Sequence, residues 1–125
     1  MLKSKHLIGL EHFPVSDLNK IIDTSFKFKD ILQTESRKAI LLKGKTIVNM
    51  FFENSTRTKI SFSLAEKRLG ADSINFSAST SSVKKGETLK DTEQNIESMK
   101  IDGAVIRHGH TVSALKLTEY IDGAV

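Results

Sequence analysis

The sequence has no cysteine, no tryptophan and no long apolar segment. Without cysteine, both a disulfide framework and a thiolate metal site are excluded. No apolar run approaches the roughly 20 residues that span a bilayer, and the first residues lack the basic, apolar and small-residue order of a signal peptide. With 125 residues, 38% of them hydrophobic, the chain can bury one core. We therefore expect at most one domain, soluble and cytoplasmic.

Acidic residues are fewer than basic ones, and the formal net charge is +4 at pH 7. This balance favours acidic partners, among which nucleic acid is the first class to consider. The lysines, however, are scattered among Glu and Asp along the predicted helices, and no aromatic residues alternate with them. Because the pattern of a recognition helix or a base-stacking surface is missing, we expect no nucleic-acid partner. A small phosphorylated and carboxylated substrate fits the charge at least as well.

Helical periodicity and short apolar runs alternate along the chain. The spacing predicts helices over residues 16–33, 55–69, 88–99 and 111–119, and strands over residues 46–52, 73–76, 104–106 and from 123 onward. This alternation is typical of an α/β fold with a parallel sheet, right-handed crossovers and helices on both faces. We expect Ser16 to cap the first helix. In the second helix we expect the apolar side chains to face the sheet and Glu66 to face water.

The most informative segment follows the buried strand 46–52. Ser55, Thr56, Arg57 and Thr58 stand where that strand gives way to a helix. A helix N-terminus offers unpaired N–H groups and the positive end of the helix dipole. The hydroxyls add donors, and the guanidinium suits phosphate oxygens. The segment predicts a phosphate site, and an ordinary helix cap with Arg57 in solvent is the alternative.

Two further polar segments follow predicted strands. Residues 77–87 form a loop rich in Ser, Lys and Gly, and Arg107-His108 ends the strand 104–106. Ligands of parallel sheets bind at the carboxyl ends of the strands. We therefore expect residues 53–58, the loop and Arg107 to converge on one edge of the sheet. Alone, the loop is best explained as a solvated surface segment, and a role of residues 78–87 in assembly is a further hypothesis.

Taken together, these segments resemble the aspartate carbamoyltransferase family over residues 46–108. The Ser-Thr-Arg-Thr tetrapeptide, the Lys-Gly-Glu loop and the Arg-His strand end occur in the family's order. Ornithine carbamoyltransferases share the tetrapeptide but differ at the loop and at the Arg-His pair. The resemblance implies that residues 1–125 are the N-terminal part of an incomplete, truncated carbamoyl phosphate-binding domain, and that the aspartate-binding domain is absent.

The resemblance also implies a reaction and its residues. A carbamoyl group passes from carbamoyl phosphate to the amine of L-aspartate in pyrimidine biosynthesis, with no cofactor and no metal. The residues implied to bind carbamoyl phosphate are Ser55, Thr56, Arg57, Thr58, Ser81, Lys85 and Arg107. Of these, Arg57, Thr58 and Arg107 are implied to be catalytic. The family's homotrimer implies that Ser81 and Lys85 reach a neighbouring chain's site. Glu53 resembles a residue that helps to link the family's two domains, and without the second domain we expect it to have no partner here.

The chain departs from the family pattern at Gly109, where proline is usual, and we expect the glycine to loosen Arg107. His108 and His110 share one face of an extended segment, but without a third ligand they are a weak candidate metal pair. Three functions remain open for the protein: carbamoyl transfer to aspartate, carbamoyl transfer to ornithine, and binding of a phosphate ligand without catalysis. For these 125 residues alone the last is favoured, because the aspartate site is absent.

Overall fold

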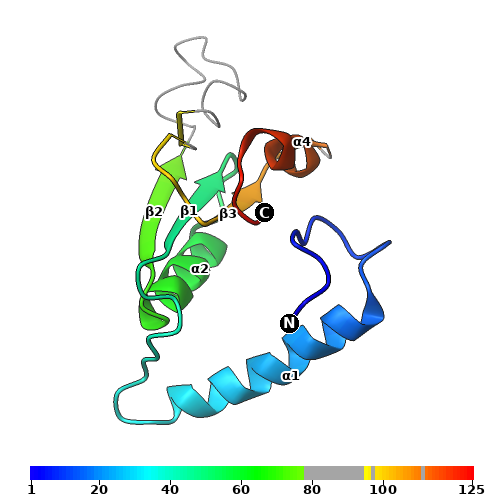
Figure 1. Cartoon of the computed structure of the whole chain (residues 1–125). Coiled ribbons are helices and arrows are strands. Elements are labelled where there is room, and N and C mark those ends of the chain that lie inside the picture. Colours follow the sequence, from blue (N-terminus) through cyan, green and yellow to red (C-terminus); the bar gives the residue numbers. More distant parts are fainter. Residues whose placement is uncertain (78–94, 97, 111) are drawn as a thin grey trace.

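The computed structural model describes residues 1–77, 95–96, 98–110 and 112–125. Its elements, coloured along the chain in Figure 1, are α1 (Val15–Leu32), β1 (Thr46–Phe51), α2 (Thr56–Arg68), β2 (Asp72–Ser77), β3 (Gly103–Arg107) and α4 (Ser113–Tyr120). The helix predicted over residues 88–99 lies largely outside the described residues. In the described part of the chain, no helix is both long and apolar enough to cross a membrane.

The three strands form a parallel sheet in the order β2-β1-β3, with β1 in the centre. Val48 of β1 is opposite Ile74 on one side and Ala104 on the other. The strand expected from residue 123 onward is present as a single parallel bridge between Gly103 and Ala124. A side chain at Gly123 would place its Cβ only 2.8 Å from the carbonyl oxygen of Asp102, so the two backbones meet closely here because residue 123 is glycine.

Alternate residues of β1 point to opposite faces of the sheet. On one face Val48 and Met50 are buried in a cluster with Leu117 of α4. On the other face lies Asn49, which contacts Glu66 of α2. Helices therefore cover both faces, which confirms the predicted α/β class. Burying one side chain the size of Met or Leu stabilises the fold by about 1.5–3 kcal/mol.

The buried face of α2 is polar, contrary to expectation. Its two buried residues are Ser63 and Glu66, whereas Ile60, Phe62 and Leu64 are 57%, 42% and 43% exposed. The predictions that Glu66 faces water and that these apolar residues face the sheet were therefore wrong. The physical reason is Asn49, a fully buried amide that needs hydrogen-bond partners and finds one in Glu66.

α1 lies apart from the sheet in Figure 1, and its N-cap is Pro14 without a side-chain cap. The prediction that Ser16 caps the helix was wrong, because the helix already begins at Val15. Asp17 is fully buried and accepts hydrogen bonds of 2.8–3.0 Å from the N–H groups of Lys3 and Ser4. These bonds, that of Lys3 above all, lower the pKa of Asp17. One carboxylate thus fastens the first residues of the chain to α1.

Candidate functional site

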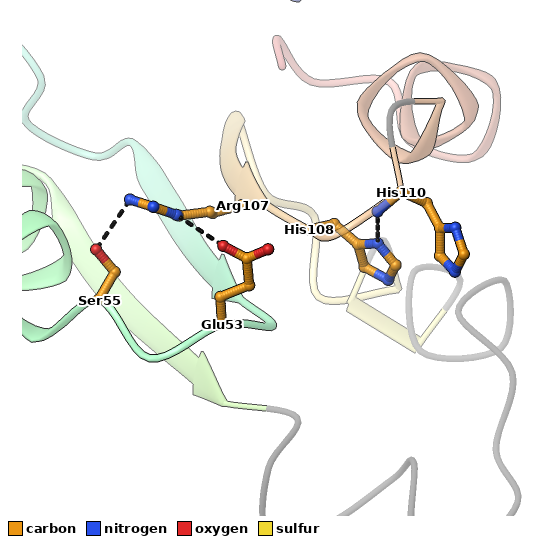
Figure 2. A network of polar contacts seen from close by, with 5 residues as sticks. All are labelled: Glu53, Ser55, Arg107, His108 and His110. Carbon is orange, nitrogen blue, oxygen red and sulfur yellow. Dashed lines mark hydrogen bonds and ion pairs between the residues drawn. The ribbon is translucent and has the colours of Figure 1, made fainter.

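Polar residues from two separate segments meet at the carboxyl ends of β1 and β3. Phe51 and Arg107 are opposite each other in the parallel register. Glu53, two residues beyond β1, therefore comes beside Arg107, and Figure 2 shows the two side chains facing each other. Arg107 donates from Nε to Glu53 Oε2 at 3.2 Å and from Nη1 to Ser55 Oγ at 3.0 Å.

This geometry decides two of the expectations from the sequence. The predicted convergence of residues 53–58 and Arg107 on one sheet edge is confirmed. The prediction that Glu53 lacks a partner was wrong, because β1 and β3 end at the same level and Arg107 is within reach. Ser81 and Lys85 lie outside the described residues, so their place at the site stays a prediction.

Residues 55–58, which we call the phosphate cradle, form the entrance to α2. The first intrahelical bond runs from the N–H of Lys59 to the carbonyl of Ser55 at 3.0 Å, so the N–H groups of residues 56–58 come before it. In the described structure no side chain caps this end, and the first turn has no acidic residue. The cradle lines an open hollow of about 480 Å³ together with Asn54. The positive end of the α2 dipole therefore meets solvent, as an anion site requires.

Arg57 and Thr58 extend the cradle in different directions. Arg57 is exposed, and among the described residues its guanidinium makes no hydrogen bond and no ion pair. Thr58 is half-buried and lines a second hollow of about 440 Å³ together with Arg107. The cation Arg57 thus lines the first hollow, and the hydroxyl of Thr58 lines the second hollow together with the cation Arg107.

His108 is held in a defined orientation next to this site. Its Nδ1 accepts a hydrogen bond of 3.0 Å from the N–H of His110 and lies 2.9 Å from Ser113 Oγ. The proton of the neutral ring is therefore on Nε2. Its ring packs on Phe52 with centroids 4.8 Å apart. Burial, followed by the charge of His110, lowers the pKa of His108. Ser113, buried in α4, had no distinguishing pattern in the sequence.

The rings of His108 and His110 stack with centroids 5.3 Å apart, as side chains on one face of an extended segment do. Among the residues that the structure describes, no group of three or more His, Cys, Asp or Glu side chains could hold a metal ion.

Gly109 lies between His108 and His110, and a Cβ there would be 3.5 Å from Glu53 Oε1, an ordinary contact. The expectation that Gly109 loosens Arg107 stays a prediction.

Comparison with known proteins identifies a family that matches this chain and proteins that are similar to it in sequence. The family described as "Aspartate/ornithine carbamoyltransferase, carbamoyl-P binding domain" matches residues 5–125. The aspartate carbamoyltransferase catalytic subunit of Christiangramia forsetii is 48% identical over 124 residues, which are 99% of this chain and 40% of that protein. The catalytic subunit of Desulfotalea psychrophila is 47% identical over 121 residues, or 97% and 38% of the two chains. The chain thus spans about 40% of the length of the curated relatives it matches.

Solved structures show the same likeness. The catalytic subunit of M. jannaschii aspartate transcarbamoylase superposes with a TM-score of 0.85 at 37% identity, over 97% of this chain and 39% of that one. The aspartate transcarbamoylase of Trypanosoma cruzi in complex with carbamoyl phosphate gives a TM-score of 0.86 at 31% identity, over 98% and 39% of the two chains. The sheet and helices described above therefore occur, in the same arrangement, in these two proteins.

Proposed function

The chain belongs to the aspartate/ornithine carbamoyltransferase family, in its carbamoyl phosphate-binding domain, and on this premise we propose that the phosphate cradle binds the phosphate group of carbamoyl phosphate. The observation that carries the proposal is the N-terminus of α2, which no side chain caps in the described part of the chain, with Arg57 exposed beside it. A phosphate dianion there would accept hydrogen bonds from the N–H groups of residues 56–58 and from the cradle's hydroxyls. Arg57 would neutralise part of its charge.

For the enzyme that includes this chain we propose carbamoyl transfer to the amine of L-aspartate, in pyrimidine biosynthesis in the cytoplasm. Support comes from the relatives, which are named aspartate carbamoyltransferases, and from a Trypanosoma cruzi relative whose structure is a complex with carbamoyl phosphate and aspartate. Ornithine as the acceptor is the less favoured alternative. For these 125 residues taken by themselves, we propose that they bind carbamoyl phosphate and do not catalyse its reaction.

In the proposed reaction the amine nitrogen of aspartate attacks the carbonyl carbon of carbamoyl phosphate. The bond from that carbon to the phosphate oxygen breaks, phosphate leaves with the electron pair, and the amine loses a proton. Negative charge grows on the carbonyl oxygen, and Thr58 and Arg107, which line one hollow, are the donors that would meet it. Glu53 and Ser55 hold the guanidinium of Arg107 in place, while Arg57 stabilises the leaving phosphate.

The loop that carries Ser81 and Lys85 completes the proposed site from another chain. The proposal rests on the sequence resemblance, in which these residues reach into the site of the adjacent subunit of a homotrimer. Lys85 would add a third cation to Arg57 and Arg107, because a phosphate dianion has charge left to neutralise.

Isothermal titration calorimetry of the Arg57→Ala variant tests the cradle. Losing a charge-assisted hydrogen bond to phosphate should weaken the binding of carbamoyl phosphate by about 1.5–3 kcal/mol. Lys67→Ala is the matched control, because Lys67 is an exposed cation in the last turn of the same helix. Its replacement should leave the affinity unchanged. Equal affinities in the Arg57→Ala variant and the unaltered chain would refute the assignment.

A further inference from the structure

A cluster of polar side chains, all buried except the half-buried Ser73, joins α2 to the sheet. We call it the polar clamp, and its members are Asn49 of β1, Ser63 and Glu66 of α2, and Ser73 of β2. Asn49 donates from Nδ2 to Glu66 Oε2 at 3.0 Å, and the hydroxyls of Ser63 and Ser73 lie 3.2 Å apart. Asn49 is fully buried, and Ser63 and Glu66 are each 7% exposed.

The clamp determines how α2 sits on the sheet. Ser63 and Glu66 are the buried residues of this helix, whereas its large apolar residues are substantially exposed. Apolar contacts tolerate sliding and rotation, but hydrogen bonds weaken steeply with distance and angle. The rotation and height of α2 above β1 and β2 are therefore set mainly by Glu66 and Ser63. Because a helix rises 1.5 Å per residue, Glu66 acts from about 15 Å behind the first residue of α2.

We propose that Glu66 is a positioning residue for the phosphate cradle: through the polar clamp it fixes where the N–H groups of residues 56–58 point. This inference rests on the proposed function, since it concerns the binding of the same phosphate group. Glu66 touches neither the cradle nor Arg107, so its effect would pass through the rigid helix.

The protonation state of Glu66 links the clamp to pH. Within the described structure, Asn49 Oδ1 and Glu66 Oε1 are buried atoms without a hydrogen-bond partner. A proton on the carboxyl group turns one of its oxygens into a donor, which lowers the cost of burying two acceptors. Burial raises the pKa of Glu66, although hydrogen bonds from Asn49 and Ser73 oppose the rise.

The charged groups around Glu66 compensate its ionised form only in part: the charge of Lys67 lowers the pKa of Glu66, whereas burial, the largest cause, raises it. These groups are Lys59 and Lys67 of α2 and Asp72 of β2, none of which forms an ion pair with Glu66 among the described residues, and β1 has no ionisable residue. A raised pKa means that the stabilisation by Glu66 is complete below its ordinary value of 4.5 and is lost as pH rises through the raised value. The clamp should therefore hold α2 more firmly at acidic pH than at alkaline pH.

Two substitutions at Glu66 test the inference, with inorganic phosphate as the probe in titration calorimetry and thermal unfolding measured alongside. Glu66→Leu removes the hydrogen bonds that Glu66 accepts from Asn49 and Ser73 and replaces the side chain by an apolar one of similar volume. It should weaken phosphate binding about tenfold, since small misplacements of binding groups are costly. Its Tm should fall, because the substitution takes an acceptor away from Nδ2 of the fully buried Asn49. Glu119→Gln, which alters an exposed carboxylate of α4, is the control and should bind as the unaltered chain does.

Glu66→Gln keeps the shape of the side chain and supplies N–H donors at every pH. The ratio of its phosphate affinity to that of the unaltered chain should rise with pH between about pH 5 and 9, and the ionisation of phosphate itself cancels from this ratio. If Glu66→Leu does not fold, this ratio decides, and a ratio independent of pH overturns the inference.

The outcomes separate this inference from the proposed function. Wild-type phosphate affinity in Glu66→Leu, together with lost binding in Arg57→Ala, would overturn the role of Glu66 and leave the cradle assigned. Absence of phosphate binding by the unaltered chain would overturn both.

Discussion

Arg107 is oriented by two side chains of the same chain. Two of its five N–H donors are used, one on Glu53 and one on Ser55, which leaves the others for a ligand. A donor already fixed near a developing negative charge needs no reorganisation during the reaction. The guanidinium is also planar and forked, so it can contact Glu53, Ser55 and a third group at once.

Replacing Arg107 should therefore affect the chemical step more than substrate binding. We expect Arg107→Ala to lower kcat by roughly two orders of magnitude in a polypeptide that also carries the aspartate site. Arg107→Lys should recover only part of this loss, because an ammonium group lacks the fork. Steady-state kinetics with carbamoyl phosphate and aspartate measure the effect. An unchanged kcat with a raised KM would show that Arg107 only binds substrate.

At the residue scale, the sequence predicted which side chains would gather but not how they pair. Arg57, Thr58 and Arg107 were candidates because their types suit a phosphate, their segments follow predicted strands, and the family resemblance implies their roles. The ion pair of Glu53 with Arg107 joins residues 54 positions apart, and it depends on the register of β1 against β3. No local pattern encodes that register, so the pair was missed.

At the scale of elements, strands were predicted more accurately than helix faces. The apolar run 46–52 gave β1 within one residue of its observed bounds, since a strand buried on both faces is nearly continuously apolar. The inward face of α2 could not be predicted from its own residues. Its one sequence signal was Asn49, a polar residue inside that apolar run, which requires a buried partner.

Asp17 provides a test at the same scale. We expect Asp17→Ala to release the first residues from α1, because its carboxylate accepts the N–H groups of Lys3 and Ser4. Hydrogen exchange of those two amides should become faster. Asp23→Ala, which alters an exposed carboxylate of the same helix, should not change their exchange.

The same contact should respond to pH in a defined direction. Because the pKa of Asp17 is lowered, its stabilisation is complete above its ordinary value of 3.8 and is lost as pH falls through the lower value. In the hydrogen-exchange experiment, unchanged exchange of the Lys3 and Ser4 amides in Asp17→Ala would show that other contacts hold the first residues on α1.

At the scale of the whole molecule, the proposed site is divided between chains. The cradle and Arg107 come from one chain, and Lys85 is proposed to come from its neighbour in a trimer. Two variants that are inactive on their own should then complement each other in the enzyme that includes this chain. Mixed trimers of Arg57→Ala and Lys85→Ala subunits contain some sites with Arg57 from one chain and Lys85 from the next.

Activity of the mixture after subunit exchange measures this division, and native mass spectrometry confirms the exchange. We expect activity above that of either variant alone. A mixture that exchanges subunits but stays inactive would show that Lys85 acts within its own chain or has no role.

The central claim is that the entrance of α2 binds the phosphate of carbamoyl phosphate, and a titration followed by NMR tests it most directly. The ¹⁵N-labelled chain is titrated with carbamoyl phosphate or a phosphonate mimic. We predict saturable shifts that are largest at the amides of residues 55–58 and at Arg107 Nε, and that are lost in Arg57→Ala. Shifts concentrated elsewhere, such as at the apolar hollow between α1 and α2, or no saturable shift at the cradle, would contradict the account.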